Sequence, residues 1–119
     1  MGRVSRDIFV QDLPPGIATL EEIPDDWMPR PLPFGHAEVV EAVRQLAPDA
    51  DVSDPEWLRV SRPGVDVEVN VSTARPLQSF ALHVRAANRS DADAFIEGLL
   101  RRLDVRAFDS ESETGIFQP

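Results

Sequence analysis

The residues of this chain that could do chemistry together lie on two short segments with alternating polarity. Valine alternates with polar residues over 65–71, and apolar residues alternate mostly with polar ones over 79–85. Period-two alternation is typical of strands with one buried and one solvated face. The solvated face then collects acids, bases and an imidazole: Asp66, Glu68, Asn70, His83 and Arg85. Any site of this protein is therefore expected first on that face.

If these two segments and residues 58–61 form a meander, few pairing registers are possible, because a slip of one residue would expose the valines to water. The simplest register pairs Leu58 with Val69 and Leu82, and Val60 with Val67 and Val84, on the buried face. It predicts two rows on the opposite face, Arg59–Glu68–His83 and Ser61–Asp66–Arg85. Each row places an acid of the central strand beside a base of a neighbouring strand.

Two interpretations of these rows stay open. As cross-strand charge pairs they would contribute roughly 0.2–1 kcal/mol each. Alternatively, Glu68, His83 and Arg85 line a shallow site under a long arm, where Glu68 favours the protonated imidazole for acid–base chemistry. We expect the first, because an acid and a base still need a nucleophile or a metal. The candidate binding residues are Glu68, Asn70, His83, Arg85 and, on the arm, Trp27; no catalytic residue is assigned.

Metal and cofactor chemistry finds little support in the sequence. The chain has two histidines and no cysteine, which excludes a multi-histidine site within one chain, a thiolate site and disulfides. The acidic clusters at 21–26 and 109–113 lack the ligand spacing of an EF-hand loop, and no glycine-rich phosphate loop is present. We expect no metal and no cofactor, and we expect both clusters to be solvated surface.

Composition narrows the classes of partner. The chain has 119 residues, of which 42% are hydrophobic, as suits one domain spanning 1–119. Its net charge is −9, and all twelve bases are arginine. Nucleic-acid binding needs a basic footprint, so we expect none, whereas a basic protein would be attracted. No segment is typical of a signal peptide or a membrane span, which predicts a cytoplasmic protein that does not bind membranes.

Before and between the alternating segments, the sequence predicts a first strand, a long arm and a helix. The first strand, 7–13, has apolar residues on both faces and is expected to be covered on each side. Residues 14–35 hold six of the eleven prolines together with Trp27, Met28, Leu32 and Phe34. That apolar content predicts an ordered arm lying across the body of the protein.

The helical and turn signals complete the predicted fold. Amphipathic helices are expected at 36–47 and 91–103, the second capped by Ser90, with a capping box at 53–56. We expect a four-residue connection at 62–65, a last strand at 105–109 and a stub at 116–117. Together these elements predict an α+β two-layer sandwich: a mainly antiparallel sheet of about four to five strands, with both helices packed on one face.

The C-terminal half resembles a group of small bacterial proteins without an established activity. The resemblance rests on Val67-Glu-Val-Asn-Val71, Ser79-Phe-Ala-Leu-His-Val-Arg85, Arg106-Ala-Phe-Asp109 and Thr114-Gly-Ile-Phe117, and covers about residues 66–117. Members of that group often continue His-Val-Arg with two glycines, where this chain has Ala86 and Ala87. The resemblance implies one domain and a binding or immunity-like role, since small acidic α+β proteins often neutralise basic toxins.

These observations predict a non-enzymatic protein-interaction module with a basic protein partner. The alternative is a small enzyme or ligand-binding domain that uses Glu68, His83 and Arg85, which requires a concave pocket over those residues. The sequence leaves the oligomeric state open.

Overall fold

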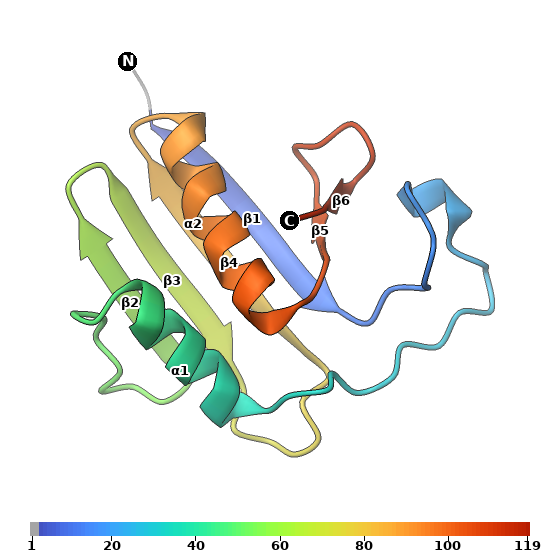
Figure 1. The fold of residues 1–119 in the computed structure, drawn as a ribbon, viewed down its shortest axis with the longest axis horizontal. Coiled ribbons are helices and arrows are strands. Elements are labelled where there is room, and N and C mark those ends of the chain that lie inside the picture. The colour runs from blue at the N-terminus through green and yellow to red at the C-terminus, as the bar shows by residue number, and fades with distance from the viewer. Residues whose placement is uncertain (1–2) are drawn as a thin grey trace.

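A six-stranded antiparallel sheet forms the frame of the computed structural model, which describes residues 3–119 (Figure 1). Its order is β2-β3-β4-β1-β5-β6. The strands are β1 (Val4–Gln11), β2 (Trp57–Arg62), β3 (Val65–Val71), β4 (Ser79–Ala86), β5 (Ala107–Asp109) and β6 (Ile116–Phe117). The α+β class is as predicted, but the count of four to five strands was too low, because β6 is a paired strand of only two residues.

Two helices, α1 (His36–Leu46) and α2 (Arg89–Leu103), lie over the same face of this sheet (Figure 1). The backbone is only 18 Å deep along its shortest axis, which leaves room for one sheet and one layer of helices. Among the residues described, neither helix has the length and apolar character needed to cross a membrane. Within residues 3–119, no helix covers the other face of the sheet, which lies behind the helices in the view of Figure 1.

The buried face of the sheet follows the predicted alternation. Leu58 pairs with Val69 and Val69 with Leu82, and the row Val60–Val67–Val84 lies beside them. These side chains are at most 2% exposed and pack against the buried stripes of the helices. These are the predicted pairs, so the register of the meander is confirmed. A slip of one residue would have turned the valines of β3 away from the helices.

The second helix begins earlier than the sequence indicated. Its N-cap is Asn88, not Ser90, and the Asn88 side chain accepts the Asp91 N–H at 2.9 Å. Both positions have an acid three residues on, so the sequence pattern fits either start. At the other end, Asp104 adopts a left-handed φ of 52°, and its N–H donates to the Arg101 carbonyl at 3.2 Å.

The turn between β2 and β3 is shorter than predicted. Arg62 pairs directly with Val65, which leaves Pro63 and Gly64 as a two-residue connection in place of the four-residue one. Gly64 has a φ of +83°, the region that the second central residue of a Pro-Gly turn requires. The pairing of Arg62 with Val65 shows that this turn does not splay the strands. The capping box predicted at 53–56 was wrong. The Asp54 carboxylate, and not the Ser53 hydroxyl, accepts the Glu56 N–H, at 3.0 Å, and Trp57 begins β2.

The first strand is covered on one face only. Ile8 and Val10 are buried under the helices, whereas Phe9 on the opposite face is 45% exposed. The expectation that both faces are covered was therefore wrong. Leu13 is buried because the chain leaves the strand before it, at Gln11, and turns into the arm.

The arm, residues 14–35, lies beyond β5 and β6 and is ordered by contacts along its length (Figure 1). Arg106 donates to the carbonyls of Ile17 and Pro14 at 2.8 and 2.7 Å. The Leu20 N–H, in a short 3-10 turn, donates to the Thr114 carbonyl at 3.0 Å. Near the arm's end, the buried Leu32 donates its N–H to the Leu77 carbonyl at 2.8 Å. The arm is thus fixed beside the sheet.

Candidate functional site

The open face of the sheet carries both predicted rows of polar residues, and β1 extends them. Arg59 pairs with Glu68 and Glu68 with His83, and His83 pairs in turn with Asp7. The second row runs Ser61–Asp66–Arg85–Ser5. The extension by β1 was missed because the sequence does not state which strand lies beside β4.

The direct partner of His83 is Asp7 and not Glu68. The Nδ1 atom of His83 lies 2.8 Å from the Asp7 Oδ1, and both side chains are largely exposed. The Trp57 ring stacks on the imidazole, with centroids 6.4 Å apart and planes 23° from parallel. A carboxylate at Nδ1 fixes the tautomer of an imidazole and leaves Nε2 available as a base or donor. The arrangement therefore orients His83, although solvent surrounds the pair.

Asp66 is the most tightly held acid of this face. Its two carboxylate oxygens accept hydrogen bonds from the Arg3 guanidinium at 2.7 Å and from the Ser61 hydroxyl at 2.9 Å. These two donors, with a smaller contribution from nearby Arg85, lower the pKa of Asp66 below its ordinary 3.8. Asp66 therefore stays ionised at neutral pH and serves as a fixed negative charge.

A shallow depression of about 500 Å³ lies over these rows. Glu68, His83 and Arg85 line it together with Asp7 and Arg59, whereas Asn70 is not among the lining residues. A depression of this kind is what the enzyme or ligand-binding alternative requires. Its charges balance, since three arginines face three carboxylates. Within residues 3–119, no three His, Asp or Glu side chains converge in a way that could hold a metal ion.

The row next to the depression carries no charge. Trp57 pairs with Asn70, Asn70 with Ala81, and Ala81 with Phe9. Trp57 and Phe9 are 38% and 45% exposed, and they are two of the three large exposed hydrophobic residues in the described chain. Asn70, predicted as a binding residue, thus belongs to this uncharged row and not to the charged ones.

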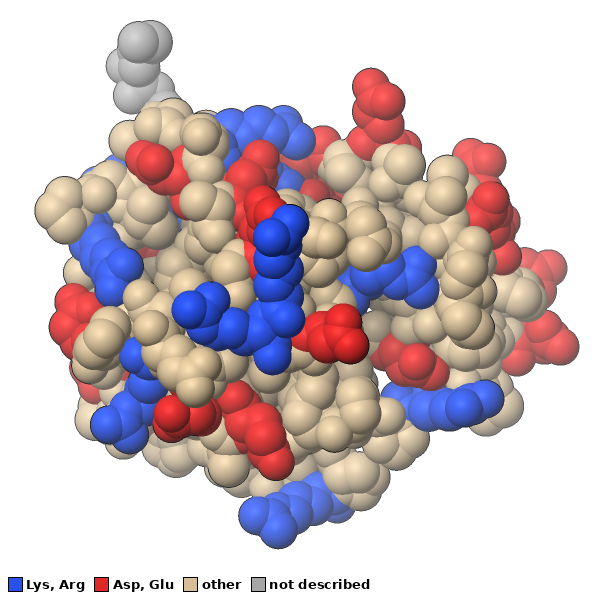
Figure 2. All heavy atoms as spheres, in the orientation of Figure 1, with Lys and Arg blue, Asp and Glu red and all other residues tan. Residues whose placement is uncertain are grey.

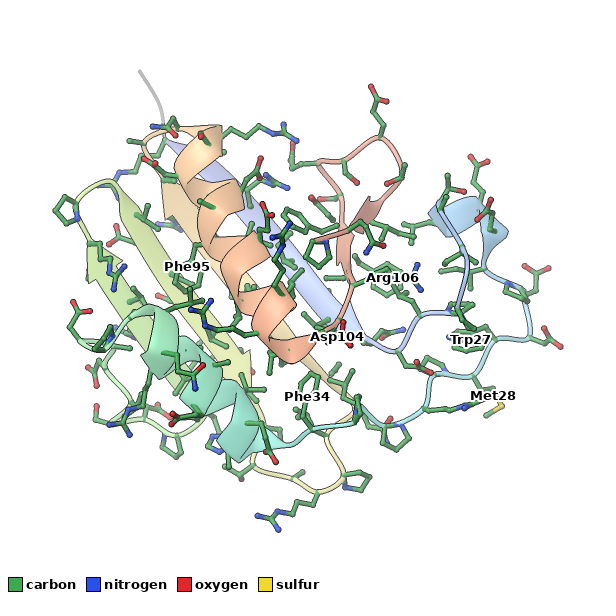
Figure 3. The ribbon with its side chains drawn as sticks, in the orientation of Figure 1. Trp27, Met28, Phe34, Phe95, Asp104 and Arg106 are labelled. Carbon is green, nitrogen blue, oxygen red and sulfur yellow. The ribbon has the colours of Figure 1, made fainter. Side chains whose placement is uncertain are left out.

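Trp27 lies on the arm, away from the predicted face. Its indole N–H donates to the Asp12 carbonyl at 3.3 Å, so it anchors the arm to the end of β1. The neighbouring Met28 is 82% exposed, and Figure 3 shows both side chains on the outer stretch of the arm. No arm residue lines the depression, so the expectation that the arm covers Glu68, His83 and Arg85 was wrong.

The arm and the β5–β6 loop together form an acidic surface, which we call the acidic lobe. Six exposed acids define it: Glu21, Glu22, Asp25, Asp26, Glu111 and Glu113. The backbone hydrogen bond from Leu20 to Thr114 holds the two segments side by side. In Figure 2, acidic side chains gather along the right-hand edge of the molecule, over these segments. In the described part of the chain, none of the six forms an ion pair.

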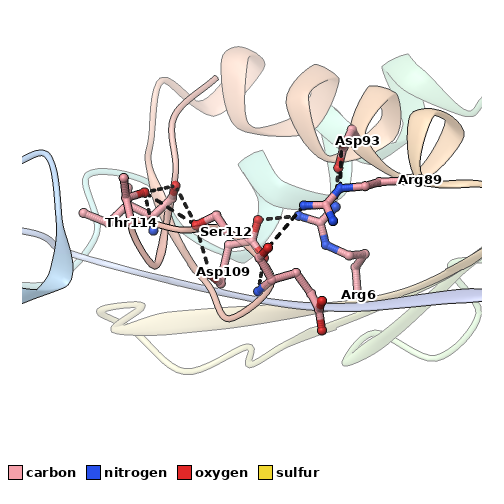
Figure 4. A network of polar contacts seen from close by, with 8 residues as sticks. Arg6, Arg89, Asp93, Asp109, Ser112 and Thr114 are labelled. Carbon is pink, nitrogen blue, oxygen red and sulfur yellow. Dashed lines mark hydrogen bonds and ion pairs between the residues drawn. The ribbon is translucent and has the colours of Figure 1, made fainter.

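A buried ionic network lies on the other face of β1, where the sequence analysis assigned no role. Arg6 is 2% exposed and donates to Asp109 of β5 and to Asp93 of α2 (Figure 4). Asp109 is 1% exposed, so the expectation that the 109–113 cluster is solvated was wrong for this residue. Its carboxylate also accepts the Glu111 N–H at 3.0 Å. The signal was available, because Arg6 has the same parity as Ile8 and Val10 and so must face the core. The network joins a strand, a helix and the β5–β6 loop and has the character of a structural support.

A second hollow, of about 650 Å³, lies between the arm and the C-terminal end of α2. Leu13, Ile17 and Leu32 line it on the arm side, and Arg101 and Arg106 on the other. The Arg106 guanidinium is already engaged by the arm carbonyls, and Arg101 pairs with Glu97 at 2.7 Å. These two arginines therefore serve the arm and α2.

Comparisons with protein-family models, curated proteins and solved structures found no match for this chain. The resemblance of residues 66–117 to small bacterial proteins stays a prediction.

Proposed function

We propose that this protein is a non-enzymatic interaction module that binds a basic protein partner through the acidic lobe. An immunity-like role, in which such a module neutralises a basic toxin, is one form of this function. The observation that carries the proposal is an ordered lobe with six exposed acids and no ion pair among the described residues. Carboxylates that form no ion pair within their own chain remain available to lysine and arginine side chains of another protein.

The exposed Met28 gives this surface an apolar contact point. At 82% exposure it is the most exposed large hydrophobic residue of the described chain, two positions from Asp26. Interfaces commonly combine an apolar centre with a charged rim, and methionine adapts well to irregular partner surfaces. The arm's hydrogen bonds to Arg106, Thr114 and Leu77 order the backbone beforehand, which reduces the entropy lost on binding.

The test compares two neutralising double variants in a capture experiment from the native host. Asp25→Asn with Asp26→Asn removes two charges from the lobe, whereas Glu41→Gln with Glu56→Gln removes two exposed charges elsewhere. We expect wild type and the control to retain the same basic protein at low salt and to release it at high salt. The lobe variant should bind that purified protein at least about tenfold more weakly, since each 1.4 kcal/mol is a factor of ten.

If both variants lost the same amount of binding, the total charge of the protein would explain the loss. That result would contradict a binding site on the acidic lobe. Retention by the lobe variant would contradict it as well. Failure to retain any basic protein, together with turnover of a small molecule, would contradict the proposed function itself.

A second candidate function, a small enzyme or ligand-binding domain, is supported by the depression over Glu68, His83 and Arg85 and by the Asp7–His83 contact at 2.8 Å. An enzyme of this kind would need a nucleophile that a base activates. The serines of this face, Ser5 and Ser61, lie in the row next to that of His83 and not in the same row, so His83 does not activate them. A small molecule that shifts the Trp57 indole resonance in wild type but not in His83→Gln would favour this candidate.

A further inference from the structure

The open sheet face has a symmetry that the acidic lobe lacks. Four adjacent strands, in the order β2-β3-β4-β1, present three transverse rows on this face. Listed from β2 to β1 they are Trp57–Asn70–Ala81–Phe9, Arg59–Glu68–His83–Asp7 and Ser61–Asp66–Arg85–Ser5. A two-fold axis parallel to the strands, between β3 and β4, would place each row against its own reversed copy.

Each reversed row is complementary to itself. In the first charged row, Arg59 would face Asp7 of the second copy, and Glu68 would face His83. In the second, Asp66 would face Arg85 and the two serines would meet. In the uncharged row, Trp57 would face Phe9, and Asn70 would face Ala81. We propose that this face binds a second copy of the chain, forming a symmetric dimer in which two sheets pack face to face.

The distribution of charge favours a second copy over other occupants of this face. The chain carries a net charge of −9, yet the depression has three arginines and three carboxylates and is formally neutral. The entire negative excess therefore lies outside the lining of the face. Two strongly acidic molecules can approach closely only through such a surface, whereas a basic partner is better attracted by the acidic lobe.

The area of the open sheet face limits the expected affinity of the dimer. Four strands spaced about 4.8 Å apart and seven residues long, at about 3.3 Å each, span roughly 19 by 23 Å, or about 440 Å² in projection. A standard stable interface buries about 800 Å² per partner, so we expect a dimer at the weak end of the range. The charged rows line a depression and would meet partly through ordered water, which leaves most of the affinity to Trp57 and Phe9.

The packing is compatible with known sheet geometry. Two sheets that pack face to face lie about 10 Å apart, with their mean strand directions within about 30° of each other. A two-fold axis near the strand direction produces this alignment. The proposal is independent of the basic partner, because the acidic lobe lies beyond β5 and β6 and contributes no residue to the depression.

Sedimentation analysis from about 1 to 500 µM, where small interfaces associate, tests the proposal. We expect wild type to be a dimer at the upper end of this range. Phe9→Asp should raise the dimer dissociation constant at least about tenfold, since a two-fold interface contains each residue twice. Met28→Asp is the matched control: it replaces another exposed apolar residue by the same charge, away from this face, and should stay dimeric.

Charge reversal supplies a second test that does not depend on Phe9. Arg85→Glu and Asp66→Arg should each weaken the dimer, whereas an equimolar mixture of the two variants should restore it, because each mutated side chain then faces its opposite charge. Thermal melts establish that both variants are folded. Wild type that stays monomeric throughout, a dimer that resists Phe9→Asp, or a mixture that stays monomeric would each overturn the proposal.

Discussion

At the scale of single residues, Arg6 is the buried charge on which the packing of β1, α2 and β5 depends. It lies inside the protein at 2% exposure, and two carboxylates from distant parts of the chain accept its hydrogen bonds. Its Nε atom has no protein partner among the described residues. A buried ion pair adds little over a well-packed apolar pair, but removing one partner leaves the other charge buried. The loss of stability on removing Arg6 thus comes mainly from the Asp109 carboxylate, which would remain buried without a cation.

Arg6→Met should therefore lower the free energy of unfolding by about 3–5 kcal/mol at neutral pH, because it leaves the Asp109 carboxylate, 1% exposed, without its cation. Urea denaturation would measure the change. The control is Arg44→Met on the exposed side of α1, for which we expect a change within about 0.5 kcal/mol. A loss of less than 1 kcal/mol for Arg6→Met, on the order of an ordinary surface change, would contradict this account.

At the scale of the elements, β3 decides which face of the sheet is buried. Val67, Val69 and Val71 are at most 1% exposed and lie under the helices. Val69→Asp should unfold the protein, since an unpaired buried charge costs several kcal/mol against a typical total stability of roughly 5–15 kcal/mol. Glu68→Asp, at the adjacent position on the open face, should leave the thermal melt nearly unchanged. A folded Val69→Asp variant would mean that the two faces are assigned the wrong way round.

The same alternation explains how much of the fold could be predicted. The register of β2, β3 and β4 followed from the sequence because a shift of one residue exposes every valine. The position of β1 between β4 and β5 could not be predicted, because alternation identifies a strand but not its neighbour. Hence the rows were predicted one strand too short, and the Asp7–His83 contact was missed. Arg6 was missed because the predicted strand began at residue 7.

At the scale of the whole molecule, the chain separates two kinds of surface. The open sheet face is formally neutral around its depression and carries Trp57 and Phe9 beside it. The acidic lobe at the other end of the sheet order carries Met28 and six exposed acids. Because β2, β3, β4 and β1 build the first surface and the arm and β5–β6 loop build the second, the two can be disturbed separately. A second copy on one surface and a basic partner on the other would leave both accessible at once.

The position at which the lobe can be loosened without touching β2, β3, β4 or β1 is Gly115. It has a φ of +77°, and a Cβ atom there would clash with the Leu20 side chain of the arm. Gly115→Ala should therefore push the arm away from the β5–β6 loop and weaken the hydrogen bond from Leu20 to Thr114. We expect cleavage after Glu22 by a glutamate-specific protease to accelerate at least about fivefold, corresponding to roughly 1 kcal/mol of local stability.

Gly64→Ala is the matched control for this change. Gly64 has nearly the same φ, +83°, but a Cβ atom there meets only ordinary contacts, at 3.7 Å or more, far from the arm. Both variants carry a similar backbone strain, so a difference in cleavage between them isolates the contact of the arm with the loop. Gly115→Ala should also weaken binding of the basic partner while the dimer persists, because the sheet face is unchanged. Equal cleavage rates in the two variants would show that the β5–β6 loop does not hold the arm, and the acidic lobe would then lose its status as a preformed surface.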